Sequence, residues 1–113
     1  MHNHNEYFKS DFLYNELMKE EDFATVANLF AQLADASRLK IFWLLCHSRE
    51  CVQDIAEIMK MTNPAVSHHL KILKDAGLIE GYRDGKEVIY GASKNQTAQA
   101  LHGITEKLMS ITC

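Results

Sequence analysis

One short stretch of the chain combines an apolar helical face with polar and charged groups on its other faces. Val66, Leu70 and Leu73 recur at helical spacing, which predicts the buried side of a helix. The other faces carry small, hydroxyl, imidazole and ammonium groups, which can pair with base edges and phosphates in the major groove. These outward residues are Ala65, Ser67, His68, Lys71 and Lys74. The stretch therefore predicts a helix that reads DNA, which we call the reading helix.

A second, shorter helix is predicted immediately before the reading helix. Its apolar face is formed by residues three and four apart, Ile55, Ile58 and Met59. Lys60 ends this helix, and Thr62 or Asn63 can cap the next one. Pro64 fits the first turn of the reading helix, where a backbone N–H has no intrahelical partner. Two helices joined by such a short turn form a helix-turn-helix.

The periodicity changes from helical to alternating after the reading helix. Residues 78–83 and 87–90 flank Asp84 and Gly85, which is typical of a β-hairpin with a tight glycine turn. Arg83 and Lys86 flank the tip of this hairpin, which we call the wing. Two cations on a hairpin that directly follows a reading helix are placed to contact the DNA backbone or the minor groove.

The rest of the chain is predicted to be helical, apart from a mobile arm at residues 1–10. Apolar residues at helical spacing predict one or two helices between residues 13 and 34. Asp35 then caps a helix from about Ala36 to Cys46, and a long apolar stripe predicts a terminal helix from Asn95 to Ile111. The expected fold class is mainly α with a small β-hairpin, a winged helix-turn-helix.

Composition places the chain among folded proteins of the cytoplasm. It has 113 residues, of which 47% are hydrophobic and 24% charged, so residues 11–113 are expected to form a single domain. No apolar run reaches the roughly 18 to 20 residues of a membrane span, and the first residues lack a secretory apolar region. Three cysteines at irregular spacing argue against a disulfide framework. We therefore expect a cytoplasmic protein with no membrane partner.

The net charge of −3 conceals a locally basic region. Residues 60–86 carry five basic and three acidic side chains, so the segment that contains the reading helix and the wing is positive. Local charge governs the attraction to phosphates, because salt screens charges beyond roughly 8 to 10 Å. The acidic surplus is concentrated in the first 22 residues and is interpreted as a solvated helix face.

Several motifs in a fixed order resemble one family of regulators. They are Leu33-Ala34-Asp35 with Ser37-Arg38-Leu39, the run from Val66 to Leu73, Ala76-Gly77-Leu78-Ile79, and Arg83-Asp84-Gly85-Lys86. The segment that contains them covers over half of the chain and looks like the ArsR/SmtB family of metal-responsive transcriptional repressors. The resemblance implies a winged-helix homodimer with dimerisation helices at both ends of the domain. It also implies a repressor that leaves its operator when metal binds.

The same resemblance assigns roles to residues of the reading helix and the wing. It implies that five residues face the operator, namely Asn63, Ala65, Ser67, His68 and Lys71, and that Arg83 and Lys86 grip its backbone. A two-fold dimer places its reading helices about 34 Å apart, on successive major-groove faces. The double-stranded DNA operator is therefore expected to be an imperfect inverted repeat.

The metal site implied by the resemblance is incomplete in this sequence. In metal-sensing members, two cysteines separated by one residue lie at the start of the helix that precedes the reading helix. This chain has Cys51 and Gln53 at these positions. The expected effector is a divalent ion such as Zn, Cd, Pb, Ni or Cu. A lone thiolate cannot enclose Cd, Pb, As or Zn, because these ions take three or four soft or borderline ligands. The remaining candidate ligands are His2 and His4 in the arm, and Cys46 and His47 just before Cys51.

A second metal site of the family lies on the terminal helix, and it is not expected here. The ligand positions are occupied by Lys94, Gln96, Glu106 and Ser110, and lysine and serine are poor ligands. His102 remains on that helix, where a single imidazole is interpreted as a surface or interface residue.

Two alternatives to the metal-released repressor stay open. In one, the same DNA-binding repressor is triggered by oxidation of Cys46, Cys51 or Cys113, because exposed thiols of low pKa oxidise readily. In the other, the chain is a protein-interaction module that does not bind DNA, although the intact reading helix and wing argue against this. An enzyme is not expected, because Cys46 and His47 are neighbours on a helix and the sequence shows no oxyanion loop or third catalytic partner.

Overall fold

The computed structural model describes residues 11–17 and 19–112, which belong to two compact units. The first unit, Met1–Ala31, contains helix α2 (Asp11–Leu17) and most of α3 (Glu20–Gln32). The second unit, Gln32–Cys113, contains the other helices and the sheet. The arm predicted at residues 1–10 lies outside the described residues.

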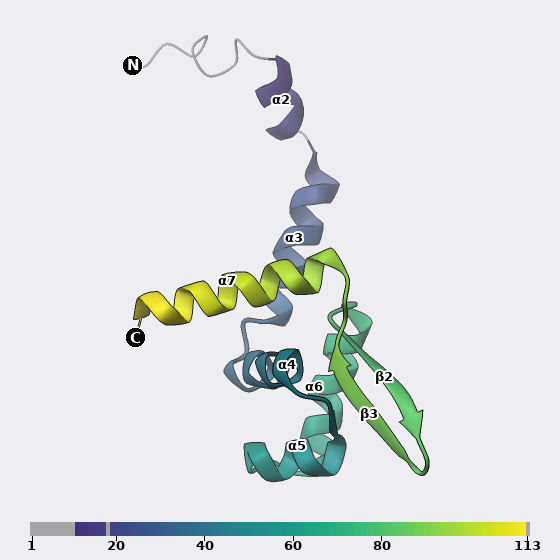
Figure 1. Cartoon of the computed structure of the whole chain (residues 1–113). Coiled ribbons are helices and arrows are strands. Elements are labelled where there is room, and N and C mark those ends of the chain that lie inside the picture. The colour runs from purple at the N-terminus through teal and green to yellow at the C-terminus, as the bar shows by residue number, and fades with distance from the viewer. Residues whose placement is uncertain (1–10, 18, 113) are drawn as a thin grey trace. The chain divides into compact units, whose positions relative to one another are not determined.

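The second unit contains a helix-turn-helix followed by a wing. Its elements in chain order are α4 (Ala36–His47), β1 (Glu50–Cys51), α5 (Val52–Met59), α6 (Asn63–Asp75), β2 (Ile79–Asp84), β3 (Glu87–Ala92) and α7 (Gln96–Thr112). Figure 1 shows α5 and α6 as the helix-turn-helix and β2 and β3 as the wing. The predicted fold class is confirmed. Across the described residues, no helix has the length and apolar character needed to span a bilayer.

Local capping chemistry starts and ends the helices where the sequence predicts. The Asp35 carboxylate caps α4 by accepting a hydrogen bond from the backbone N–H of Arg38 at 2.9 Å. The Thr62 hydroxyl caps α6, and Pro64 lies in the first turn of that helix. Lys60 ends α5 in the left-handed conformation, with φ of 56°. This conformation reverses the chain within a few residues, which gives the short turn into α6.

The core of the second unit lies between the helices and one face of the sheet. The largest fully buried side chains are Phe42, Ile41, Ile55, Leu73, Leu78 and Val66. On α5 the buried face centres between Ile55 and Ala56, and Ile58 lies about 110° from that centre at 100° per residue. Ile58 is 55% exposed, so the apolar face predicted for α5 is wrong at this position.

The turn of the wing is one residue further along than the sequence predicts. Asp84 pairs with Glu87, so the two-residue loop consists of Gly85 and Lys86. Gly85 has φ of 66°, a conformation that glycine adopts without strain. Lys86 therefore lies in the turn, at the tip of the wing.

The sheet has a third strand, β1, that the sequence analysis did not predict. The strands are antiparallel in the order β1-β3-β2, and Cys51 of β1 lies opposite Ile89 of β3. Two residues are too few to show alternating periodicity, which explains why β1 was missed. The strand joins the end of α4 to the wing.

Replacing Thr62 by alanine is expected to lower the free energy of unfolding by about 1 kcal/mol. The variant removes the oxygen that accepts a hydrogen bond from the N–H of Ala65 at 3.3 Å. Urea unfolding followed by circular dichroism measures the change, and Thr62→Ser is the control that keeps the hydroxyl. Equal midpoints for the alanine and serine variants would contradict the role of this cap.

Candidate functional site

Helix α6 presents a polar face away from the core. Asn63, Ser67, His68 and Lys71 are exposed on it, whereas Ala65 is half-buried. The opposite face is buried at Val66, His69, Leu70 and Leu73. The predicted reading residues on α6 therefore share the accessible side of this helix, and Ala65 offers only part of its methyl group.

The adjacent histidines of α6 lie in different environments. His68 is exposed, whereas His69 is 9% exposed. The Nε of Arg38 on α4 donates to Nδ1 of His69 at 3.3 Å, and Nη1 of Arg38 donates to the carbonyl of Gln32 at 3.0 Å. Burial lowers the pKa of His69 despite the opposing charge of Asp35, so the neutral ring can accept this bond. Arg38 thus connects α4 to the buried side of the reading helix.

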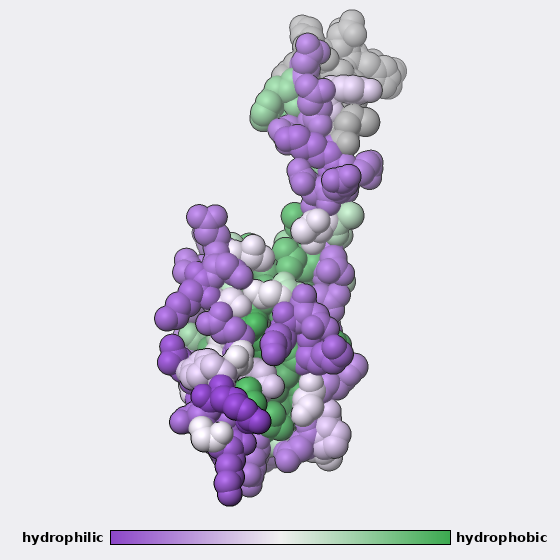
Figure 2. Space-filling model, turned by 90° about the vertical axis from the view of Figure 1, so that its right-hand side faces the viewer, coloured by the Kyte–Doolittle hydropathy of each residue, from purple (hydrophilic) through white to green (hydrophobic). Residues whose placement is uncertain are grey.

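The wing places two more cations on the surface of the same unit. Arg83 lies on β2 opposite Val88, Lys86 lies in the turn, and both side chains are exposed. Figure 2 shows that the side of the molecule bearing the wing is mainly hydrophilic. A groove between α6 and β3 is lined by Ser67, Leu70, Lys71, Lys74, Asp75 and Tyr90. The reading helix and strand β3 of the wing therefore border one groove, which carries the cations Lys71 and Lys74.

Lys71 is available to a phosphate. Its ammonium group lies 3.2 Å from Asp75, one turn along α6, and both side chains are well exposed. An exposed ion pair of this kind contributes roughly 0.3 to 0.5 kcal/mol, so a DNA phosphate can replace the carboxylate at little cost. Lys71 can therefore exchange its carboxylate partner for a phosphate.

Among the described residues, the predicted ligands Cys46, His47 and Cys51 do not form one cluster. Cys51 precedes the first residue of α5, makes no capping hydrogen bond with its side chain and is only 7% exposed. Cys46 is half-buried on α4. In residues 11–17 and 19–112, no group of three or more close metal-ligating atoms includes either cysteine. His2 and His4 lie outside this part of the chain. Of the three candidates within the described residues, His47 belongs to such a group.

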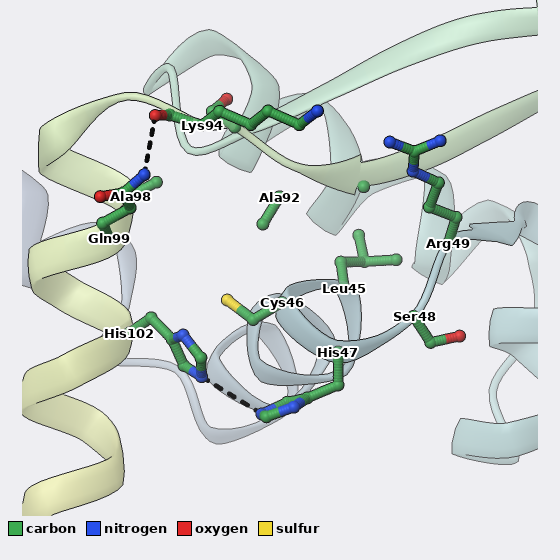
Figure 3. A pocket seen from close by; sticks show the side chains of 12 residues that line it. Leu45, Cys46, His47, Ser48, Arg49, Ala92, Lys94, Ala98, Gln99 and His102 are labelled. Atoms are coloured by element: carbon green, nitrogen blue, oxygen red, sulfur yellow. Dashed lines mark hydrogen bonds between the residues drawn. The ribbon is translucent and has the colours of Figure 1, made fainter.

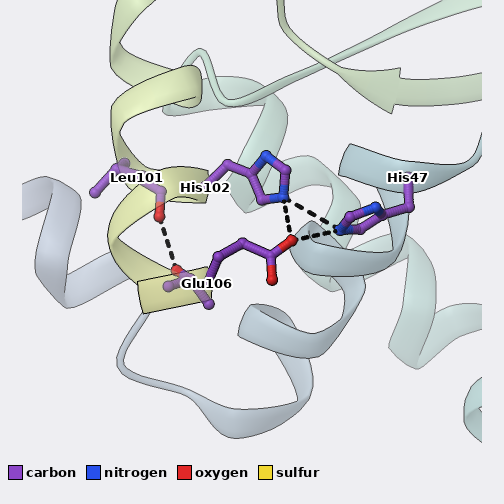
Figure 4. A network of polar contacts seen from close by, with 5 residues as sticks. His47, Leu101, His102 and Glu106 are labelled. Atoms are coloured by element: carbon purple, nitrogen blue, oxygen red, sulfur yellow. Dashed lines mark hydrogen bonds and ion pairs between the residues drawn. The ribbon is translucent and has the colours of Figure 1, made fainter. Parts of the chain in front are cut away.

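His47 meets two residues of α7 whose combination the sequence analysis missed. Its Nε2 lies 3.2 Å from Nε2 of His102 and 3.0 Å from Oε1 of Glu106, and His102 Nε2 lies 3.0 Å from the same oxygen (Figure 4). We call these three residues the His-His-Glu cluster. His102 is therefore not the isolated imidazole that its sequence context suggested. The spacing of His102 and Glu106, one helical turn apart, was a usable signal, but nothing local points to His47.

The surroundings of the His-His-Glu cluster favour a charged carboxylate. Burial acts to raise the pKa of Glu106, but hydrogen bonding by His102, the nearby indole N–H of Trp43 and the charge of His47 lower it on balance. The ring of Trp43 lies 4.3 Å from the ring of His47 and restricts its orientation. The buried Nε1 of Trp43 forms no hydrogen bond of standard geometry among the described residues, yet its proximity still favours the carboxylate.

A pocket of about 390 Å³ opens beside two members of the cluster. Figure 3 shows the sulfur of Cys46 and the ring of His102 on its wall, together with His47, Arg49 and Lys94. Burial, reinforced by the charge of Glu106, raises the pKa of Cys46 to about 11. Cys46 is therefore a protonated thiol at neutral pH.

Cys46 in the native protein is expected to react with iodoacetamide roughly 100-fold more slowly than in the urea-unfolded chain at pH 7.5. The shift of its pKa from 9.0 to about 11 reduces the reactive thiolate by that factor. Because the thiol binds its proton more tightly in the folded state, the associated stability is complete below pH 9.0 and is lost as the pH rises through about 11. Peptide mass spectrometry measures the rate at Cys46, and similar rates in both states would contradict the burial of this thiol.

Comparison with known proteins shows relatives along most of the chain. The family described as "Bacterial regulatory protein, arsR family" matches residues 35–81. A transcriptional repressor SmtB homolog of Synechocystis is 33% identical over 93 residues, which cover 82% of this chain and 70% of that protein. The cadmium resistance transcriptional regulatory protein CadC of Listeria innocua is 43% identical over 70 residues, which cover 61% of this chain and 59% of that protein.

The architecture also matches a solved DNA-binding domain. A domain from Mycobacterium bovis, described as a homodimeric winged helix-turn-helix DNA-binding domain, has a TM-score of 0.72 and 27% sequence identity, covering 82% of this chain and 85% of that one. The fold and the reading face thus define a winged helix-turn-helix regulator. The chain belongs to the ArsR/SmtB family of transcriptional repressors. Its relatives are regulators of transcription and not enzymes, which confirms that prediction.

Proposed function

We propose that the chain acts as a homodimer that binds an inverted-repeat operator and leaves it when a soft or borderline metal ion binds. The observation that carries the DNA-binding part is the exposed polar face of α6 in the same unit as the cations of the wing. In this proposal Asn63, Ser67 and His68 contact base edges, with Ala65 in apolar contact. Lys71, Arg83 and Lys86 contact phosphates.

Helix α7 supports the dimeric part of the proposal. Ile104 and Ile111 are exposed apolar residues on this helix, and α2 and α3 also expose large apolar side chains. An exposed apolar face on a helix is typical of a subunit interface. The M. bovis domain is described as homodimeric. Two copies related by a two-fold axis would present their reading helices about 34 Å apart, the spacing of successive major-groove faces.

The metal effector rests on relatives and on ligand chemistry. CadC of L. innocua is named for cadmium resistance, and the described residues contain the His-His-Glu cluster. Oxidation at Cys46 or Cys51 is the weaker trigger, because the pKa of Cys46 is raised and Cys51 is buried. Cys113, the third thiol of that alternative, lies outside the described residues. A coupling free energy of about 1 to 3 kcal/mol between metal and DNA would change operator affinity roughly 5- to 150-fold.

The test uses an inverted-repeat duplex that the purified protein selects from a random-sequence pool. Fluorescence anisotropy is expected to show binding that weakens steeply with salt, with two subunits per duplex in analytical ultracentrifugation. Salts of Zn, Cd, Pb, Ni and Cu are added in turn, and at least one is expected to release the DNA until EDTA restores binding. Failure to bind any duplex would support the interaction module, and release by peroxide but by no metal would support thiol oxidation.

A further inference from the structure

We propose that His47, His102 and Glu106 form a binding site for a borderline divalent cation such as Zn²⁺ within one subunit. The inference deepens the proposed function by naming its sensing site, and its regulatory part rests on that function. The site joins the last residue of α4 to the middle of α7. The two histidines are 55 positions apart in the sequence. The side chains are 41%, 29% and 44% exposed, so an ion can reach them from solvent.

Protons cannot satisfy the three contacts of the cluster at the same time. Glu106 as a carboxylate only accepts hydrogen bonds, so both histidines must carry a proton on Nε2 to bond to it. Two Nε2–H groups then face each other across 3.2 Å. Removing the Nε2 proton from one histidine relieves the repulsion between the two N–H groups. The lone pair of that nitrogen then faces the negatively charged Glu106 oxygen at 3.0 Å, which is also repulsive. A single cation in the centre would satisfy both nitrogens and the oxygen.

The distances match the geometry of a tetrahedral ion. Zinc binds imidazole nitrogen and carboxylate oxygen at about 2.0 to 2.2 Å, which places two tetrahedral ligands roughly 3.3 Å apart. The three observed separations are 3.0, 3.0 and 3.2 Å. Three protein ligands leave a fourth position for water or another donor. Imidazole nitrogen and carboxylate oxygen are suitable ligands for Zn, Ni or Cu. They are poorer ligands for a soft ion that requires several thiolates.

Neighbouring contacts hold the ligands in place. His102 and Glu106 lie one turn apart on the same face of α7, so the backbone of that helix sets their separation. The ring of Trp43, one turn before His47 on α4, lies against the His47 imidazole. Ligands fixed by such neighbours lose less conformational freedom when an ion binds.

Both elements that the ion would join are bonded to the reading helix or its end. Helix α4 contacts α6 through the bond between Arg38 and His69. Asn95 lies directly before α7, and its side-chain Nδ2 donates a hydrogen bond at 2.9 Å to the backbone carbonyl of Gly77, just after α6. The side-chain Oδ1 of Asn95 accepts a hydrogen bond from the backbone N–H of Ala98 in α7 at 2.8 Å. An ion that fixes the distance between α4 and α7 therefore acts on two attachments of α6. This gives the site a physical route to operator affinity.

Metal binding is tested first, on the full chain without DNA. Competition with a chromophoric chelator is expected to show one Zn²⁺ per subunit, and Co²⁺ is expected to give tetrahedral absorption bands without thiolate charge transfer. His102→Ala and the isosteric Glu106→Gln should each weaken Zn²⁺ binding by more than roughly 100-fold. Loss of a group that only orients a ligand costs about 10- to 100-fold, so a larger loss identifies a direct ligand. His68→Ala, which removes an exposed histidine of α6, and Cys51→Ser should keep wild-type affinity. Circular dichroism verifies that each variant is folded.

The possible results separate this site from the proposed function. Absence of Zn²⁺ binding, retained binding in His102→Ala and Glu106→Gln, or loss confined to Cys51→Ser would overturn the site, and none of these results depends on DNA. In a second step, His102→Ala should bind the selected duplex like the wild type in EDTA but should no longer be released by Zn²⁺. Normal release of this variant would overturn the regulatory role. Failure of the wild type to bind DNA would refute the proposed function and leave the metal result standing.

Discussion

Replacement of Lys71 by alanine is expected to weaken binding to the operator and to random duplex DNA by the same factor, about 5- to 10-fold near physiological salt. The reason is that an ammonium group on the exposed face of α6 attracts any phosphate, and the existing partner of Lys71 is a well-exposed carboxylate. The slope of log affinity against log salt concentration should fall by about 1. Fluorescence anisotropy with both duplexes at several salt concentrations measures both quantities.

Ser67→Ala is the matched variant, one turn earlier on the same helix. Ser67 is expected to read a base edge, so its loss should weaken operator binding roughly 2- to 12-fold, the value of one hydrogen bond. Binding to random DNA and the salt slope should not change. Equal losses on the two duplexes would show that Ser67 does not contact a base.

Leu73→Ala is expected to lower the free energy of unfolding by about 2 to 5 kcal/mol. Leu73 is fully buried on the core side of α6, and a smaller side chain leaves a cavity between this helix and the rest of the core. Lys74→Ala, at the adjacent and exposed position, should change stability by no more than about 0.5 kcal/mol. Urea unfolding of both variants measures the difference, and equal costs would mean that packing at Leu73 does not hold α6.

The helix-turn-helix and the wing could be predicted because short-range chemistry determines them. Asp35 and Thr62 cap the helices that follow them, and Pro64 fits the first turn of α6. The alternating pattern and the glycine at the turn predict the hairpin, with an error of one residue at its tip. Each of these features depends on residues within a few positions of each other, so the sequence alone contains the necessary information.

The features that were missed depend on contacts between distant segments. Strand β1 exists because Glu50 and Cys51 pair with β3, about 40 residues later in the chain. The His-His-Glu cluster requires the end of α4 to pack beside α7, and no spacing rule for a single helix connects His47 to His102. Cys51 illustrates the opposite case. From the sequence it is a candidate metal ligand and oxidation site, whereas the fold buries it in the core.

The order of the strands leaves the outer edge of β2 without a neighbouring strand. Because β3 lies in the middle, β2 has a neighbour on one side only, and its outer edge displays backbone groups that could pair with another chain. Glu80, Arg83 and Asp84 place charges of both signs along this edge. Such charges disfavour pairing of this edge with the same edge of another molecule, because the pairing would bury the charged side chains or bring like charges together. We therefore expect these exposed charges, which lie outside the core, to keep the wings of neighbouring molecules from pairing into a shared sheet.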